Sequence, residues 1–176
     1  MLIKESDFKD SALDHIAEDM CVAARTAPKA KGIDLIVTAI VKGDTVNKLA
    51  ERMLKIQKEQ NGSQSYIRDA ESIKQASHIV LIGTKLQVID LKACGICGYK
   101  DCGHKAPEAL CAFNPGDLGI AIGSALSVAA DHRVDNRIMF SVGRAAVELG
   151  LLGPDVKMAM GIPLSVTGKN PFFDRK

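Results

Sequence analysis

Hydrophobic and polar positions follow two alternating periods along the first half of the chain. Apolar residues recur every three or four positions over 11–25, which is the pattern of a helix with one face on a core. The run 34–41 is almost continuously apolar and rich in β-branched residues, and 78–82 is similar, so both predict buried strands. Between them, 44–60 has a helical period and 63–77 has a weaker one. We therefore expect strands and helices to alternate.

The second half of the chain contains a strongly apolar stretch that begins with a helix-start signature. Asn114 is a capping amide, Pro115 suits the first helical position, and Asp117 places an acid in the first turn. Residues 118–130 are apolar on almost every side of a helix. This pattern predicts a central, buried helix.

Three further features complete the expected fold. Gly119 and Gly123 would let another element approach the central helix closely. The stretch 134–149 predicts one more helix, and 156–166 predicts a last strand in which Pro163 must lie at an edge or a bulge. The tail after this strand is expected to be extended. The residues alone thus predict one layered domain of the α/β or α+β class.

Composition and charge narrow the function classes. The chain has 176 residues, 47% of them hydrophobic and 25% charged, which is enough for one sizeable core. The net charge of +2 comes from 23 basic and 21 acidic residues that are dispersed, and there is no Trp, so we expect no nucleic-acid partner. Neither a signal peptide nor a run of about 18 apolar residues occurs, which predicts a cytoplasmic protein without a membrane partner.

The cysteines are the main chemical signal. Four of the five lie within 18 positions, at Cys94, Cys97, Cys102 and Cys111, with two, four and eight residues between them. Cysteines of cytosolic proteins are more often metal-binding or catalytic than disulfide-bonded, and four thiolates suit an iron–sulfur cluster or a tetrahedral zinc. Gly95 and Gly98 directly follow two of the cysteines and permit the positive φ angles with which a backbone wraps a cluster.

The spacing favours a cluster over zinc. Structural zinc sites usually pair two C-x-x-C knuckles on separate hairpins, whereas these gaps widen along one loop. Among clusters, [4Fe–4S] is the favoured type. His104 lies in the same loop and is an alternative ligand, although a solvated loop histidine is the simpler interpretation. Cys21 stands apart and is expected to be an inert, buried thiol.

The segment from Cys94 to Cys102, C-G-I-C-G-Y-K-D-C, resembles the start of known four-cysteine [4Fe–4S] domains. Domains of this kind occur in the corrinoid iron–sulfur protein of acetyl-CoA synthesis and in Rnf-type electron-transport subunits. Those domains usually leave a longer gap before the fourth cysteine and follow it with Pro. Here Cys111 is followed by Ala112. Cys111 is therefore assigned as the fourth ligand mainly because a four-cysteine cluster needs one more thiolate.

Other segments resemble nitroreductase-like flavoproteins. The sequence A-A-R-T-A-P-K-A-K-G at 23–32 is similar to their A-R-x-A-P-S-x-x-N segment, 117–126 to their long central helix, and M-G-I-P at 160–163 to their closing strand. Together with the cysteines, the chain resembles the prokaryotic family described only as ferredoxin-domain-containing proteins. The resemblance implies an α+β fold, with a nitroreductase-like mixed sheet surrounded by helices. It also implies one domain over 1–176, with an inserted iron–sulfur segment at 92–113.

The same resemblance implies a homodimer that binds FMN between its subunits. The basic residues that it places near the FMN phosphate are Arg25, Lys29, Lys31, Lys169 and Arg175. The family's Ser and Asn fall at Lys29 and Gly32, however, and its Gln-Pro-Trp is replaced by 34–36. The alternative interpretation of 25–31 is a solvated helix end, because cations stabilise a helix C-terminus without any ligand.

The sequence leads to three hypotheses for function. The first is a cytosolic redox protein, an FMN-dependent oxidoreductase if it is an enzyme, in which a [4Fe–4S] cluster exchanges electrons with a flavin or a small-molecule acceptor. The second is a ferredoxin-like carrier or binding module without a substrate, with a redox partner protein. The third is an interaction protein with a structural zinc site. No P-loop, no Rossmann glycine motif and no H-E-x-x-H occurs, so nucleotide hydrolysis, a Rossmann NAD site and zinc proteolysis lack support.

Overall fold

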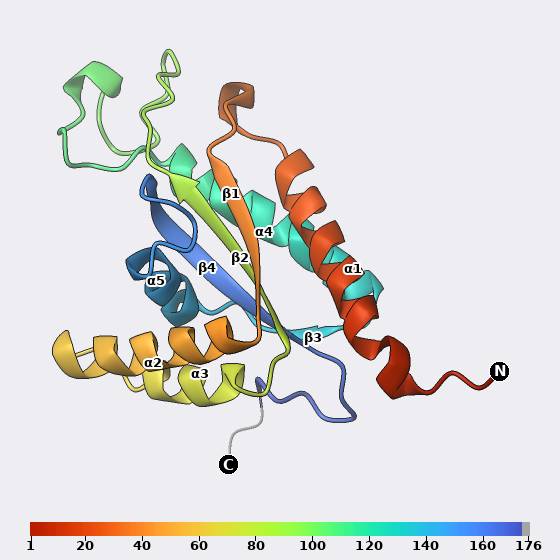
Figure 1. Ribbon diagram of the computed structural model, residues 1–176. Helices are drawn as coiled ribbons and strands as arrows, with labels where there is room; N and C mark the ends of the chain where they lie inside the picture. Colours follow the sequence, from red (N-terminus) through yellow and green to blue (C-terminus); the bar gives the residue numbers. More distant parts are fainter. Residues whose placement is uncertain (174–176) are drawn as a thin grey trace.

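The computed structural model describes residues 1–173, which form a four-stranded sheet between two layers of helices (Figure 1). The elements in chain order are α1 (Glu5–Thr26), η1 (Ala30–Gly32), β1 (Ile36–Lys42), α2 (Asp44–Glu59), α3 (Ser65–Ile73), β2 (His78–Lys85), η2 (Cys102–His104), α4 (Phe113–Asp131), β3 (Asp135–Asn136), α5 (Phe140–Glu148) and β4 (Val156–Ser165). Here η1 and η2 are short 3-10 turns.

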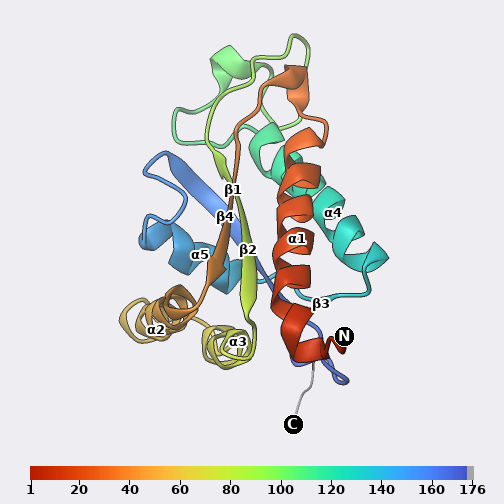
Figure 2. The ribbon, with the colours of Figure 1, turned by 45° about the vertical axis from the view of Figure 1, so that its right-hand side comes forward.

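The two helical layers follow from the two faces of β2, which is buried along almost its whole length. Ile79 and Leu81 belong to the core shared with α2, α3 and α5, whereas Val80 and Ile82 belong to the core shared with α1 and α4. Successive side chains of a strand point to opposite faces, so a strand covered on both faces is apolar at every position. Figure 2 shows α1 and α4 side by side on one face of the sheet and α2, α3 and α5 on the other.

The sheet is antiparallel at every strand pair that the described residues form, in the order β1-β2-β4-β3. The predicted α+β class is confirmed, and the expectation of a mixed sheet is wrong. Pro163 lies in regular register on β4, an inner strand of this sheet, so the predicted edge or bulge position is wrong. The N–H of Gly161 donates to Met139 O at 3.0 Å, so the nitrogen of Pro163, two residues later, faces the side of β4 on which β3 has ended at Asn136.

The helix predicted over 134–149 begins later than expected. Met139 pairs with Gly161 through two backbone hydrogen bonds of 2.8 and 3.0 Å, so the chain before it is extended and contains β3. The prediction is wrong for these residues because the partner strand is distant in sequence. α5 therefore begins only at Phe140.

The central helix α4 is confirmed, but it is buried on one face only. Ile120 is 48% exposed, and Gly116, Gly119 and Gly123 are exposed beside it. No other part of the described chain lies within 4 Å of the Cβ position at Gly119 or Gly123. The close approach expected at these two glycines is therefore not made within one chain, and the prediction of a helix buried on all sides is wrong.

The tail after β4 folds back onto the body of the chain, contrary to the expected extended conformation. Phe172 is 2% exposed and belongs to the core under α2 and α5. Its carbonyl accepts a hydrogen bond of 2.8 Å from Arg137 Nη1, and Asn170 Nδ2 donates to Asp135 Oδ1 at 3.1 Å. The buried side chain of Phe172 thus anchors the described part of the tail to the core.

The closest contact between α5 and the sheet gives a stability prediction. A Cβ atom at Gly143 would lie 1.9 Å from Ala159 O and 2.3 Å from its carbonyl carbon, so Gly143→Ala forces two backbones apart. We expect a loss in free energy of unfolding of about 3 kcal/mol or more, at or above the upper end of ordinary overpacking. Urea unfolding would measure it. Gly168→Ala is the control, with no atom within 4 Å of its Cβ position, and equal stability of the two variants would contradict this packing.

Candidate metal centre

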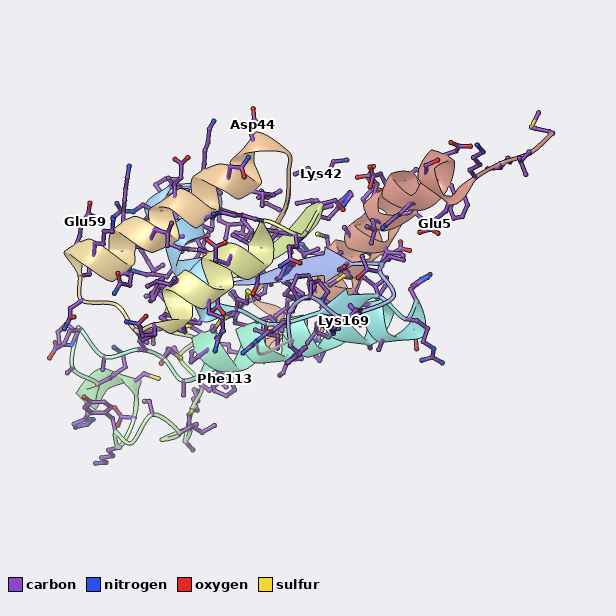
Figure 3. All side chains as sticks on the ribbon, turned by 90° about the horizontal axis from the view of Figure 1, so that it is seen from below. Glu5, Lys42, Asp44, Glu59, Phe113 and Lys169 are labelled. Carbon is purple, nitrogen blue, oxygen red and sulfur yellow. The ribbon has the colours of Figure 1, made fainter. Side chains whose placement is uncertain are left out.

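The four clustered cysteines lie on one loop, residues 86–112, which joins β2 to α4. This loop contains no strand and no helix other than the three-residue turn η2. It projects beyond the ends of β1 and β2 in Figure 1, and Figure 3 shows it standing clear of the body next to Phe113, where α4 begins. Cys111 is buried directly before α4, whereas the other three cysteines are partly exposed.

All four cysteines line a single pocket. The other residues that line it are Val88, Ile89, Asp90, Leu91, Gly95, Asp101, Lys105, Ala112 and Phe113. Cys111, the least certain of the four from sequence, thus faces the same space as Cys94, Cys97 and Cys102. The pocket brings together thiols that are up to 17 positions apart in the sequence.

The backbone around the cysteines has the left-handed turns that the sequence predicts. Gly95 has a φ of 64° and Gly98 a φ of 85°, and Gly98 N donates to Gly95 O at 2.9 Å to close a tight turn. Asp90 and Ala93 also have positive φ, at 57° and 54°, which the sequence did not indicate. Non-glycine residues adopt this region at a cost, so contacts elsewhere must hold the start of the loop.

Burial and neighbouring negative charge both disfavour ionisation of Cys102. Partial burial is the largest factor that raises the pKa of Cys102, followed by the negative charge of Asp90 and of the other three cysteines. These effects favour the neutral thiol, whereas a bound cation would favour the thiolate. Within residues 1–173, no three His, Cys, Asp or Glu side chains converge closely enough to hold one metal ion as they stand. The cysteines therefore share a pocket rather than one coordination point.

His104 is bound to its own turn. Its Nδ1 lies 2.7 Å from Asp101 Oδ1, and its backbone N–H donates to the same oxygen at 3.0 Å. The hydrogen bond from His104 is the main reason why the pKa of Asp101 is lowered. Since His104 is exposed and held by Asp101, the simpler interpretation of a solvated loop histidine fits its position.

Side chains from two other elements hold the start of the loop. Asn114, which is only 2% exposed, accepts a hydrogen bond from Gln87 N at 3.2 Å and donates to Gln87 O at 3.0 Å. Lys31 Nζ donates to Ile89 O at 3.2 Å and to Asp90 O at 3.3 Å. The capping role predicted for Asn114 is wrong, because this amide lies inside α4 and pairs with the loop instead.

A third contact joins these two elements to each other. Asp117 of α4 is buried, and its Oδ2 accepts a hydrogen bond of 3.1 Å from the backbone N–H of Ala30 in η1. Sequence reasoning placed Asp117 in a helix-start signature and missed this role. The available signal was a pair of polar residues, Asn114 and Asp117, at the start of a helix whose other inward positions are apolar.

Three of the five predicted FMN contacts lie at the loop end of the molecule, and each is engaged with oxygens of its own chain. Arg25 Nη1 lies 2.5 Å from Asp34 Oδ2 and 2.7 Å from Ile36 O. Lys29 Nζ donates to three carbonyls at the end of α1: Ala24 at 3.0 Å, Ala27 at 2.7 Å, and Arg25. Lys31 binds the cysteine loop.

The fourth predicted contact is at the opposite end of the sheet. β4 pairs with β2 so that Val156 lies beside Lys85, where the cysteine loop begins, and Leu164 lies beside His78. Lys169 follows the end of β4 and is therefore far from Arg25, Lys29 and Lys31 within one chain. Arg175 lies outside the described residues.

Comparison with known proteins places the chain in a family. An uncharacterized protein of Archaeoglobus fulgidus is 41% identical over 184 residues, which cover 99% of this chain and 98% of that protein. The model of a family described as uncharacterized proteins containing a ferredoxin domain (DUF2148) matches residues 107–175. The chain belongs to this family. Of the four clustered cysteines, the matched range contains only Cys111.

Solved structures confirm the nitroreductase-like fold. A nitroreductase with bound FMN from Desulfitobacterium hafniense is 15% identical, with a TM-score of 0.63 over 89% of this chain and 79% of that chain. A putative nitroreductase in complex with FMN from Desulfovibrio desulfuricans is 13% identical, with a TM-score of 0.59 over 93% and 79%. At such identities the likeness concerns the fold alone. Among residues 1–173, none of the helices combines the length and apolar character needed to cross a membrane.

The contacts of Lys29 lead to a prediction that separates its two interpretations. Because its ammonium group binds three carbonyls at the end of α1, Lys29→Met should destabilise the flavin-free protein by about 1 kcal/mol, within the range for cations at helix C-termini. Thermal or urea unfolding without FMN would measure this.

Lys58→Met is the matched control, since Lys58 also lies in the last turn of its helix, α2, but no side-chain hydrogen bond of Lys58 occurs within the described residues. If Lys29→Met left the stability of flavin-free protein unchanged and lowered only its affinity for FMN, the helix-capping role would be refuted.

Proposed function

We propose that the protein is an iron–sulfur redox protein in which Cys94, Cys97, Cys102 and Cys111 hold a [4Fe–4S] cluster. The observation that carries this proposal is the single pocket lined by all four residues. Each thiolate of a [4Fe–4S] cluster binds a different iron, so the sulfurs must surround a common space. A single zinc instead needs its sulfur ligands about 2.3 Å from one point.

The donor set and its surroundings suit a cluster. When bound, the cluster would supply one-electron redox chemistry. Gly95 and Gly98 allow backbone to turn closely around the pocket, and Cys111 closes it from the side of the helix. Ile96, between the first two cysteines, is 65% exposed and lies where a redox partner protein would make contact. The family's ferredoxin-domain description agrees with a redox role.

The second hypothesis, a ferredoxin-like carrier on a nitroreductase-like scaffold, also has a specific observation in its favour. Arg25, Lys29 and Lys31 are engaged with oxygens of their own chain, so a flavin phosphate would have to compete for these groups. In an FMN-dependent oxidoreductase, the FMN phosphate would have to replace these intrachain contacts. A gain in thermal stability from added FMN would favour an FMN-dependent oxidoreductase, and no gain would favour a carrier.

The cluster proposal predicts the composition of the protein and its response to mutation. Anaerobically purified protein should contain about four irons and four sulfides per chain, and Cys102→Ser should lose most of both. Cys21→Ser is the control, because Cys21 lies on α1 and is not part of the pocket. About one zinc per chain without sulfide would establish the zinc hypothesis, and full iron content in Cys102→Ser would contradict the assignment.

We further propose a homodimer that binds FMN between its subunits. The exposed face of α4, with Ile120 among Gly116, Gly119 and Gly123, is an apolar surface that a second copy would cover. Because Lys169 lies far from Arg25 in one chain, only a second copy would bring these two predicted phosphate contacts together. This supports a site between subunits rather than within one.

The dimer proposal predicts that Ile120→Asp shifts the protein from dimer to monomer in sedimentation velocity and weakens FMN binding at least about tenfold, the effect of 1.4 kcal/mol. Ile67→Asp is the control, since Ile67 is similarly exposed on α3 in the other helical layer. Wild-type protein that is monomeric at micromolar concentration and gains no thermal stability from FMN would refute the dimer and the flavin site together.

A further inference from the structure

We propose that Lys31 is a positioning residue for the iron–sulfur cluster, and that it acts by holding the start of the cysteine loop. This inference rests on the proposed function and assigns Lys31 a different role from the flavin contact that the family resemblance implies. Its Nζ donates to Ile89 O at 3.2 Å and to Asp90 O at 3.3 Å. Both of these residues line the four-cysteine pocket.

The backbone of Lys31 supports a role for its side chain. Lys31 has a φ of 55°, in the left-handed region that glycine adopts without strain, and Gly32 with a φ of 65° follows it. If this turn needed only its backbone shape, glycine would suit the position better than lysine. The feature that lysine adds is a long side chain with three N–H donors, and here it reaches two carbonyls of another segment.

The lysine is one part of a closed ring of contacts. Lys31 holds Ile89 and Asp90 from η1, Asn114 of α4 holds Gln87, and Asp117 of α4 holds the backbone of Ala30 next to Lys31. Three hydrogen-bonded links make up the ring: Lys31 to the loop, the loop to Asn114, and Asp117 to η1. The first turn of α4 joins Asn114 to Asp117 and closes it. Asn114, Asp117 and Ile89 are buried, so water competes little for the bonds made by the two α4 side chains. Lys31 and Asp90 are exposed, so the bond to Asp90 O is open to water and the bond to Ile89 O is the more shielded of the two.

The ring connects both ends of the cluster loop. Cys94 lies four residues after Asp90, and Cys111 lies three residues before Asn114. The first and last cysteines are therefore both close in sequence to residues that the ring fixes. Loss of the Lys31 contacts would free the chain before Cys94 while Cys111 stayed fixed by α4, and the four sulfurs would no longer be held around one space.

Lys31 would also influence the reduction potential. Reduction adds an electron to a cluster that already carries four thiolates, and a nearby cation stabilises the more negative state. Removal of the charge should therefore lower the midpoint potential. A purely structural tether would affect retention of the cluster but not the potential of the clusters that remain, so the two readouts separate the roles.

The test uses anaerobically purified full-length protein and three variants at this position. In Lys31→Gln, iron loss to a chelator should be about tenfold faster than in wild type, the lower end of the effect of removing an outer-shell partner. Its midpoint potential should fall by up to about 59 mV, a tenfold change in a one-electron equilibrium. Lys31→Arg should restore both properties, because arginine keeps the charge and the donors.

Two further variants control for charge and for folding. Lys92→Gln removes an equal charge from an exposed position in the same loop and should leave iron loss unchanged. Lys31→Gly removes the side chain together with the backbone strain, so it should keep the thermal stability of the wild type and still lose iron quickly. Iron loss and potential equal to wild type in both Lys31→Gln and Lys31→Gly would overturn the proposal.

Hydrogen exchange on metal-free protein distinguishes this inference from the proposed function. Amides of residues 86–91 should exchange faster in Lys31→Gln than in Lys92→Gln, whether or not a cluster is present. If wild-type protein held no iron but this difference appeared, the proposed function would fail and the tether would stand. Equal exchange in the two variants would refute the tether itself.

Discussion

The hydrogen bonds that fix the two ends of the cysteine loop are the constraint on which the candidate metal centre depends. The loop from 86 to 112 has almost no regular structure, so its own backbone cannot orient four thiols. Asn114 and Lys31 hold its start, and α4 begins two residues after its last cysteine. The sheet and helices thus serve as a rigid scaffold for a site built on a loop. Functional residues often lie on loops that such a scaffold positions.

The same end of the molecule explains how this chain differs from the nitroreductase-like proteins whose fold it shares. Where the resemblance expects Ser, the chain has Lys29, and where it expects Gln, the chain has Asp34. Lys29 binds carbonyls at the end of α1, and Asp34 binds Arg25. Both side chains therefore bind groups of the chain itself at this turn, and Lys31 next to it binds the cysteine loop.

The sequence predicted those features that depend on local pattern. The two-sided burial of β2 follows from its continuous apolar run, and the positive φ of Gly95 and Gly98 follows from their places beside cysteines. The features it missed depend on contacts between distant segments. The pairing of Met139 with Gly161 delays α5, and Asn114 binds Gln87 across 27 positions instead of capping its own helix. Periodicity and capping rules do not report such contacts.

EPR spectroscopy of anaerobically purified protein, after reduction with dithionite, is the decisive measurement for an iron–sulfur cluster on the four pocket cysteines. The proposed metal centre predicts the signal of a reduced [4Fe–4S] cluster in wild-type protein. It also predicts that the signal disappears when Cys94, Cys97, Cys102 and Cys111 are all replaced by serine, and that it persists in Cys21→Ser. A protein with stoichiometric zinc and no such signal, or a signal that survives replacement of all four pocket cysteines, would contradict it.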